Sequence, residues 1–316
     1  MASFGDERTR AYAVLLFMPL FFSSNIVFGR AAVVEVEPWT LAFLRWSLTA
    51  LILVPIAWKG LRVHWRLLLS QWETIGILGV LGMWICGALV YLALRHTSAT
   101  NGTLIYASTP VVVILLEAIF RGRRISAREA FGVPLALAGV VAIVVEGSLE
   151  QLMALQFNWG DILFAICTLC WAIYSVVLKR PVFASVPTLS LFAAIAVAGA
   201  LSLLPFTIWE IALVNDFPTS GSAWRSVATI VAFASLLAFG TYQYGVKVVG
   251  PSVTAVFMYL LPVYGVTLAI IFLGEQLQMF HVTGSLLVMG GVVLATFPID
   301  LIRRSGRARQ AANNSE

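Results

Sequence analysis

Two stretches of this sequence carry the same pattern of proline and glycine residues, separated by about 152 positions. The first stretch holds one proline and three glycines, and the second repeats their spacings without a gap: Pro110, Gly122, Gly132 and Gly139 correspond to Pro262, Gly274, Gly284 and Gly291. A repeat on this scale indicates similar structural units that bury a shared core. We therefore expect the chain to fold as two related halves.

The apolar content of the sequence places both halves in a lipid bilayer. Of the 316 residues 60% are hydrophobic and 11% are charged, and the mean hydropathy is +0.93, far from the balance of a soluble domain. A helix needs about 20 apolar residues to cross a hydrocarbon core roughly 30 Å thick. Ten runs are long enough, at residues 11–30, 38–57, 72–94, 98–120, 130–146, 160–179, 188–213, 226–247, 252–273 and 281–300. We predict an all-α membrane protein of ten transmembrane helices, whose longest loops are 58–71, 147–159 and 214–225.

The distribution of basic residues predicts the orientation of these helices. If both termini are cytoplasmic, the outer ends hold only Arg30, Arg95 and Arg225, and nearly all other Lys and Arg residues lie inside. This asymmetry follows the positive-inside rule. It also accounts for the net charge of +5, so nucleic acid is not an expected partner. Tryptophans at both expected interfaces fit an aromatic belt, with Trp39, Trp159, Trp209 and Trp224 outside and Trp58, Trp65 and Trp72 inside.

The number of helices in each half determines how the halves are related. Because five is odd, the second half must enter the membrane from the opposite side, and the halves are inverted repeats. We expect one repeat over residues 1–147, a second over 148–302 and a basic cytoplasmic tail over 303–316. Inverted repeats facing each other around a central cavity are the architecture of alternating-access transporters.

Several short motifs then resemble one known group of proteins. They are the run Phe21-Phe22-Ser23-Ser24-Asn25, the stretch from Pro38 to Arg45, Gly160-Asp161, Trp171-Ala172-Ile173-Tyr174, Gly250-Pro251, Leu261-Pro262 and Gly274-Glu275. In order, spacing and duplication the chain resembles the drug/metabolite transporter superfamily and, within it, the EamA-type exporters with two five-helix repeats. It is similar in appearance to bacterial aromatic amino acid exporters. The chain departs from the pattern in its first half, where Arg123 stands at the position that Glu275 occupies in the second.

The resemblance implies a cavity lined by spans one, three, four, six, eight and nine, in a multi-pass protein of the bacterial inner membrane. It implies export of amino acids, their relatives and varied drugs or metabolites.

Polar side chains on these spans are candidates to contact a cargo, because they are costly in hydrocarbon and tend to face a wet interior. They are Asn25, Asn101, Thr103, Ser175 and Gln243. Hydrogen bonds between helices are the alternative role for each.

Aromatic residues within the spans indicate the kind of cargo. Tyrosine and tryptophan combine an apolar face with a polar edge, which suits a solute with a ring or aliphatic body and a charged head. The candidates are Trp84, Tyr91, Tyr106, Trp171, Tyr174 and Tyr242, and ordinary packing in a bundle is the alternative.

Pro110 and Pro262 are predicted hinges. Each proline should leave the carbonyl four residues earlier, of Tyr106 or Met258, without a helical partner and free to accept from an ammonium group.

Few ionisable residues lie inside the spans. Arg45 binds either a carboxylate or a backbone carbonyl, and Glu117 is explained by an ion pair with Arg121 one turn later. Transport is then either facilitated or coupled to protons through Glu117.

Cys167 and Cys170 form a CxxC inside a helix, and the three histidines build no cluster, so we predict no metal and no cofactor.

Other functions remain open at this stage. A broad drug carrier or nucleotide-sugar carrier would use more buried acids or bases than this chain has. An intramembrane enzyme would need a grouped nucleophile and base, and the sequence shows no such group, so we predict that the chain is not an enzyme. A scaffold would leave the duplicated kinked helices unexplained.

The glycine pairs on spans five and ten are seven residues apart and share a face. This face is an interface either between helices of one chain or between the chains of a homodimer.

Overall fold

The computed structural model describes residues 4–33, 35–94, 96–97, 99–156, 158–214, 217–273 and 276–296, and these residues form helices without a strand. Nine helical segments of the described chain are long and apolar enough to cross a membrane, and helix α1 (Phe4–Ala32) covers the first predicted span. The predicted all-α membrane fold is therefore confirmed. The predicted tail over 303–316 lies outside the described residues.

The first half of the bundle follows the predicted spans closely. Its membrane helices are α1, then α2 (Pro38–Ile56), a third span built from α4 (Trp72–Gly79), η1 (Val80–Leu89) and α5 (Val90–Leu94), a fourth from α6 (Ala99–Tyr106) and α7 (Thr109–Arg121), and α8 (Ala127–Val144). A short helix, α9 (Leu149–Met153), lies in the predicted loop before the second half.

The second half repeats this plan. Its spans are α10 (Trp159–Leu178), α11 (Thr188–Val214), a third from α12 (Gly221–Thr229), η3 (Ile230–Leu237) and α13 (Ala238–Val249), a fourth from α14 (Pro251–Val256), η4 (Phe257–Leu260) and α15 (Leu261–Leu273), and α16 (Met279–Thr296). The one-turn 3-10 helix η2 (Pro181–Phe183) connects α10 to α11.

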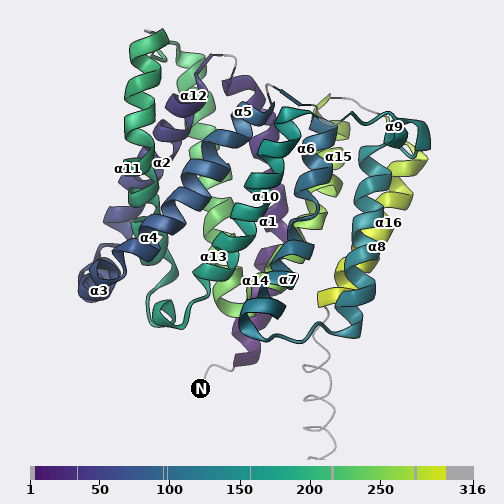
Figure 1. Cartoon of the computed structure of the whole chain (residues 1–316), viewed down its shortest axis with the longest axis horizontal. Helices are drawn as coiled ribbons and strands as arrows, with labels where there is room; N and C mark the ends of the chain where they lie inside the picture. Colours follow the sequence, from purple (N-terminus) through teal and green to yellow (C-terminus); the bar gives the residue numbers. More distant parts are fainter. Residues whose placement is uncertain are drawn as a thin grey trace, which may run out of the picture.

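The directions of corresponding spans are opposite. In Figure 1, α6 lies toward the top of the bundle and α7 toward the bottom, whereas α14 lies toward the bottom and α15 toward the top. The third spans behave in the same way, because α4 begins near the bottom beside α3 and α12 lies at the top. This is the arrangement expected of inverted repeats.

Departures from regular α-helix also occur at matching places. The third span of each half contains a π-helical segment, η1 or η3. The fourth span of each half is interrupted before its proline, by a turn at residues 107–108 in the first half and by the 3-10 segment η4 in the second. Wide and tight turns of this kind often mark functional sites and hinges, so the third and fourth spans of each half are where we look for the site.

The glycine repeat is an interface within one chain. Helices α8 and α16 pack along each other (Figure 1), and a Cβ atom added to Gly139 would lie 2.6 Å from the carbonyl oxygen of Gly284. A Cβ at Gly132 would likewise lie 2.7 Å from the carbonyl oxygen of Gly291. Close approach of two backbones needs glycine at such points. The glycines thus serve helix packing, and the homodimer stays a prediction that they do not support.

The prediction of a loop over 58–71 is wrong. Residues Trp58–Ser70 form helix α3, which packs against α2 and α11 at the lower edge of the bundle in Figure 1. The physical reason is its spacing: Leu61 and Leu68 are seven residues apart and lie on the side that is at least partly buried, whereas Trp58 and Trp65 are exposed. An amphipathic helix of this kind is typical of a membrane interface.

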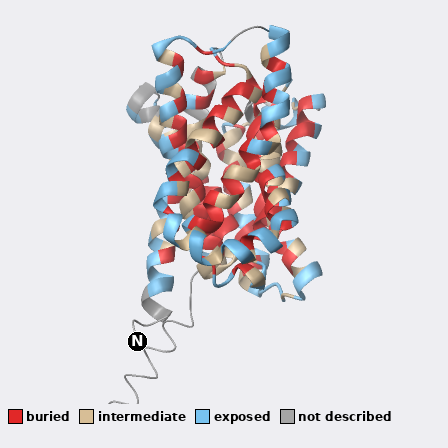
Figure 2. Cartoon of the chain, turned by 90° about the vertical axis from the view of Figure 1, so that its left-hand side faces the viewer, coloured by how far each residue is buried: buried red, intermediate tan, exposed pale blue. Residues whose placement is uncertain are grey.

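Burial follows the pattern of a protein surrounded by lipid. Buried residues concentrate along the inside of the bundle and exposed residues cover its outer faces (Figure 2). Large apolar side chains on the outer faces are exposed, such as Leu201 and Trp209 on α11 and Leu286 on α16. Apolar surface of this extent matches a hydrocarbon surrounding.

Candidate functional site

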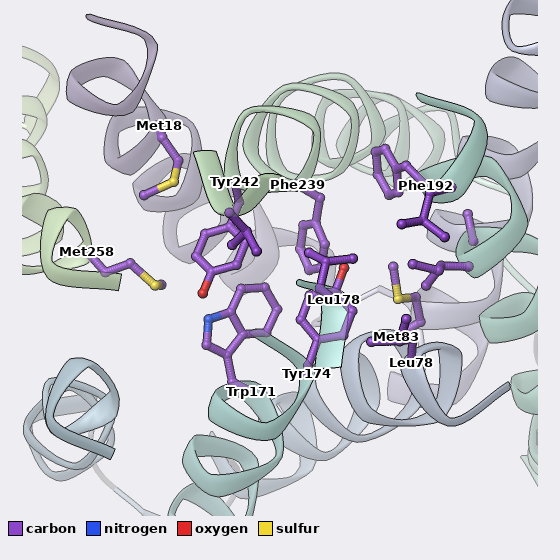
Figure 3. Packing of buried hydrophobic residues seen from close by; sticks show 14 of the residues in the cluster. Met18, Leu78, Met83, Trp171, Tyr174, Leu178, Phe192, Phe239, Tyr242 and Met258 are labelled. Carbon is purple, nitrogen blue, oxygen red and sulfur yellow. The ribbon is translucent and has the colours of Figure 1, made fainter. Parts of the chain in front are cut away.

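The centre of the bundle holds an aromatic cluster formed by Phe22, Trp171, Tyr174, Phe239 and Tyr242. The ring of Trp171 has its centroid 4.9 Å from that of Tyr242, 5.1 Å from that of Phe239 and 5.2 Å from that of Tyr174. Phe22 on α1 meets the edges of Trp171 and Tyr242 at 5.9 and 6.2 Å. The cluster therefore joins the first and sixth spans to the eighth, and Figure 3 shows its members on the sixth and eighth spans.

Helical spacing explains why these rings meet. Trp171 and Tyr174 are three residues apart on α10, and Phe239 and Tyr242 are three apart on α13, so each pair shares one helix face. In Figure 3 the hydroxyl of Tyr242 points toward the edge of the Trp171 indole, and Met18 and Met258 lie on one side of this pair. Trp171 and Tyr242, both predicted cargo contacts, are in direct contact.

Several polar atoms beside the cluster lack a well-formed hydrogen bond within the described residues. Ser175 Oγ donates to the carbonyl oxygen of Trp171 at 2.7 Å, so the Tyr242 hydroxyl donates to Ser175 Oγ. By contrast Trp171 Nε1, the Tyr174 hydroxyl and both amide atoms of Gln243 are buried without a hydrogen bond of ordinary geometry; Trp171 lies beside the Tyr242 hydroxyl, and Gln243 lies beside the Tyr174 hydroxyl. Leaving such a group unpaired costs roughly 1–3 kcal/mol. These atoms are therefore suited to bind the polar groups of a solute.

A second group of predicted residues lies between spans one, two, three and eight. The Tyr91 hydroxyl donates to Asn25 Oδ1 at 3.1 Å and accepts from Arg45 Nη1 at 3.4 Å. Arg45 also donates from Nε to Ser235 Oγ at 2.7 Å and from Nη2 to the carbonyl oxygen of Ala234 at 2.8 Å. Of the two roles left open for Arg45, the structure shows the backbone-carbonyl contact. The wide turn of η3 exposes that carbonyl to the guanidinium.

A third group surrounds the two interrupted spans. Thr103, Tyr106, Pro110, Met258 and Pro262 line a small cavity of about 40 Å³ between the breaks. The break in span four thus faces the break in span nine, which fits the prediction of paired hinges.

The expectation of bare carbonyls at these prolines is wrong. The carbonyl oxygen of Tyr106 accepts from Thr109 Oγ1 at 2.6 Å, and that of Met258 accepts from the backbone N–H of Leu261. A threonine beside the first proline and a tighter 3-10 turn before the second supply the missing donors. Each oxygen thus already accepts one hydrogen bond in this structure.

The remaining predicted residues are placed elsewhere. Trp84 packs against Trp39 and Phe206 in a separate aromatic group, with ring centroids 5.1 and 4.9 Å away in tilted and T-shaped contacts. Tyr106 packs against Phe164 at 5.8 Å and does not belong to the central aromatic cluster. The side chain of Asn101 lies outside the described residues. The predicted cargo contacts thus form three neighbouring groups and one outlying residue.

Glu117 has a closer partner than the predicted one. Its carboxylate accepts from the backbone N–H of Ser252 at 3.2 Å and from the Ser252 hydroxyl, at the first turn of α14. The predicted contact with Arg121 is present at 3.9 Å, and Arg123 is equally distant. A carboxylate at a helix N-terminus is favoured by the unpaired N–H groups there. The predicted ion pair between Glu117 and Arg121 is therefore only part of the surroundings of this carboxylate. Its closer contact, with Ser252, joins span four to span nine.

Some members of the site were not predicted from the sequence. Phe22 and Phe239 contact Trp171, and Glu210 on α11 accepts from the backbone N–H groups of Trp39 and Thr40 at 3.2 and 2.7 Å. The spacing of three residues between Phe239 and Tyr242 was a usable signal for a shared face. The contact of Glu210 with α2 joins residues 170 positions apart, and no local pattern predicts it.

The cysteines pack between helices. Cys86 Sγ lies 3.3 Å from the carbonyl oxygen of Cys167, and the three thiols are free. Within the described residues no group of three His, Cys, Asp or Glu residues could hold a metal ion.

A bundle of inverted helical repeats with unpaired polar atoms and aromatic rings at its centre has the architecture of a secondary transporter. The chain belongs to the EamA-like transporter family, which matches residues 9–145 and 158–297 as two copies. The resemblance seen in the sequence is thereby confirmed, and it makes the protein a multi-pass membrane protein of a transporter family.

Individual relatives are similar over most of the chain. An uncharacterized transporter of Bacillus subtilis, YyaM, is 27% identical to this chain. The alignment covers 95% of this chain and 98% of YyaM. The aromatic amino acid exporter YddG of Ancylobacter novellus is 23% identical, covering 91% of this chain and 98% of the relative. A probable terminal-alkyne amino-acid exporter of Streptantibioticus cattleyicolor is 26% identical, over 75% of this chain and 76% of the relative. A solved crystal structure matches this chain with a TM-score of 0.72 at 22% sequence identity. The match covers 94% of this chain and 98% of the chain in that structure, which supports the fold.

Proposed function

We propose that this protein exports amino acids, chiefly large or aromatic ones, and related amphipathic metabolites by alternating access. The cargo leaves the cytoplasm across a bacterial inner membrane, and both termini of the chain lie in the cytoplasm. The observation that carries the proposal is the aromatic cluster, whose rings are buried beside unpaired donors and acceptors on Trp171, Tyr174 and Gln243. Two relatives named as amino acid exporters support the same class of cargo.

The chemistry of the cluster suits such a solute. The faces of Trp171 and Tyr242 offer apolar contact to a ring or aliphatic chain, and the amide of Gln243 offers both a donor and an acceptor to its polar head. A cargo that satisfies these groups would recover the cost of burying them unpaired. A site that combines apolar rings with a few polar groups suits the binding and release of a small solute.

The state of Glu117 bears on how transport is driven. Its carboxylate is engaged by Ser252 and faces two arginines, so its contacts serve to join span four to span nine. We propose facilitated movement down the cargo gradient. In proteoliposomes, uptake should then follow a cargo gradient without an imposed pH gradient; uptake that needs the pH gradient and is abolished in Glu117→Gln would show proton coupling instead.

Counterflow in proteoliposomes tests the function directly. Vesicles containing the purified protein are preloaded with one unlabelled amino acid at a time, and entry of labelled phenylalanine is followed. Phenylalanine, tyrosine, tryptophan and leucine inside should drive entry, whereas glycine and a nucleotide sugar should not. Entry driven equally by the nucleotide sugar, or no counterflow with any member of the panel, would contradict the proposal.

A further inference from the structure

A basic vestibule opens at the end of the bundle that carries most of the lysine and arginine residues. It is a cavity of about 370 Å³ between the end of α10, the connection to α11, α13 and the end of α7. Four cations line it, Arg121, Lys179, Arg180 and Lys247, and no aspartate or glutamate is among its lining residues. Two carboxylates act on these cations: Glu117 faces Arg121 at 3.9 Å, and Glu7 on α1 acts on Lys247 through its charge.

The cations of the vestibule are held mainly by neutral oxygen atoms. Lys247 Nζ donates to the carbonyl oxygen of Val186 at 2.6 Å, and Lys179 Nζ donates to that of Lys247. Arg121 Nη2 donates to the carbonyl oxygen of Val176 at 2.8 Å, and Arg180 Nη1 to Thr74 Oγ1 at 2.9 Å. These contacts position the side chains without cancelling their charge. Ammonium and guanidinium groups also keep further N–H donors for another ligand.

Burial and the neighbouring charges together change the pKa of Lys179. Partial burial lowers the pKa of Lys179, and the nearby Arg121 lowers it further, while Glu117 acts in the opposite direction. Gathering like charges beside a partly buried amine is unfavourable unless an anion joins them. The vestibule thus has the electrostatics of an anion site.

The vestibule leads to the aromatic cluster. Gln243 lies in its lining, is 2% exposed and has both amide atoms unpaired. Gln243 and Lys247 are four residues apart on α13, about 6 Å along the helix axis, and Tyr242 of the cluster is the neighbour of Gln243. A solute whose anionic end meets Lys247 can therefore place a polar group at Gln243 and its apolar body toward the rings.

We propose that this vestibule is a loading site that binds the carboxylate of the cargo, and that it favours monoanions in which a carboxylate is joined to an aromatic or aliphatic body. This inference rests on the proposed function, because it takes the aromatic cluster as the next binding position of the same path. It narrows the cargo class toward members with net negative charge.

Equilibrium binding to the purified full-length protein in phosphatidylcholine nanodiscs tests the site without requiring transport. Three probes share a phenyl ring and differ in charge: 3-phenylpropionate, phenylalanine and phenethylamine. The anion should bind at least about tenfold more tightly than the cation, since charge-assisted hydrogen bonds exceed neutral ones by about this margin. Raising the salt concentration should weaken the preference. Equal affinities for the three probes would overturn the proposal.

Variants assign the effect to the vestibule. Lys247→Gln keeps an N–H donor for Val186 but removes the charge, and it should weaken binding of 3-phenylpropionate about tenfold. Lys247→Arg should restore most of the affinity, which a purely structural role would not predict. Lys59→Gln, on exposed α3 at the same end of the bundle, is the matched control and should change nothing. Equal behaviour of Lys247→Gln and Lys59→Gln would refute the assignment.

Three further results distinguish this inference from lipid binding and from the proposed function. If phosphatidylglycerol nanodiscs abolish binding of the anion, the vestibule holds a lipid phosphate and the proposal of a cargo site is wrong. If counterflow of amino acids succeeds but the three probes bind alike, only the loading site fails. If 3-phenylpropionate binds as expected but no amino acid exchanges, the proposed amino acid export fails and the anion site stands.

Discussion

At the scale of single residues, the indole of Trp171 is the most testable contact for a cargo. It is 3% exposed, its ring touches the four others of the aromatic cluster, and its Nε1–H makes no hydrogen bond of ordinary geometry with the described residues. The ring contributes to packing and the N–H group does not. The two contributions can therefore be separated by substitution.

Trp171→Phe keeps an aromatic ring and removes the unpaired donor. If the N–H group binds cargo, the apparent affinity in counterflow should fall by roughly fivefold, the equivalent of about 1 kcal/mol for one hydrogen bond, while yield and thermal stability change little. Trp209→Phe, on the exposed outer face of α11, serves as the control. Affinity that is unchanged in Trp171→Phe would remove this residue from the binding site.

Residue chemistry alone explained part of the site. The structure brings five of the predicted residues together, and their contact with cargo stays a prediction: Trp171, Tyr174, Ser175, Tyr242 and Gln243. The sequence did not reveal that Thr109 would satisfy the Tyr106 carbonyl. A hydroxyl beside a proline can point either to its own helix or away, and only the packed structure decides.

At the scale of elements, the contact between α8 and α16 depends on glycine. Gly291 lies against the backbone of α8 at Gly132 and Ala136, whereas a Cβ at the adjacent Gly290 would meet nothing within 4 Å. The two glycines therefore form a matched pair on one helix.

Gly291→Ala should lower thermal stability and Gly290→Ala should not. The added methyl group must push two helix backbones apart, and overpacking of this kind typically costs about 1–3 kcal/mol. Melting of the detergent-purified variants, followed by circular dichroism or tryptophan fluorescence, gives the comparison. Equal melting temperatures for the two variants would contradict the close approach of α8 and α16.

The paired breaks in spans four and nine are the proposed hinges. Pro262→Ala supplies an N–H group that can bond to the Met258 carbonyl and straighten η4 into an α-helix; Pro110→Ala acts in the same way on span four. Turnover in counterflow should fall several-fold while the amount of protein in the membrane stays the same. Pro134→Ala, inside the regular helix α8, is the control. Loss of transport and of membrane expression in equal measure would refute the hinge role.

Element boundaries were largely predictable because long apolar runs in lipid have few alternatives to a helix. Helix α3 was missed because hydropathy alone does not detect an amphipathic segment; the spacing of Leu61 and Leu68 carries that information. The π-helical segments η1 and η3 were not predicted either. Their stabilising contacts come from distant residues, as the bond from Arg45 to the Ala234 carbonyl illustrates.

At the scale of the whole molecule, two repeats of opposite direction exchange stabilising contacts. Glu117 on span four caps the start of span nine, and Glu210 on span seven caps the start of span two. Each carboxylate thus holds the N-terminus of the corresponding span in the other repeat. The halves are joined by charged contacts near the helix starts and by the aromatic cluster between them, and we predict that the bundle changes shape at the breaks beside Pro110 and Pro262.

The inversion of the two repeats is the central claim, and side-specific thiol labelling tests it most directly. In a variant without Cys86, Cys167 and Cys170, single cysteines are introduced at the exposed residues Ser70, before span three, and Thr219, before span eight. A membrane-impermeant maleimide should label Thr219→Cys in intact cells and Ser70→Cys only after permeabilisation. Labelling of both positions from the same side of the membrane would contradict the inverted arrangement and the transport path built on it.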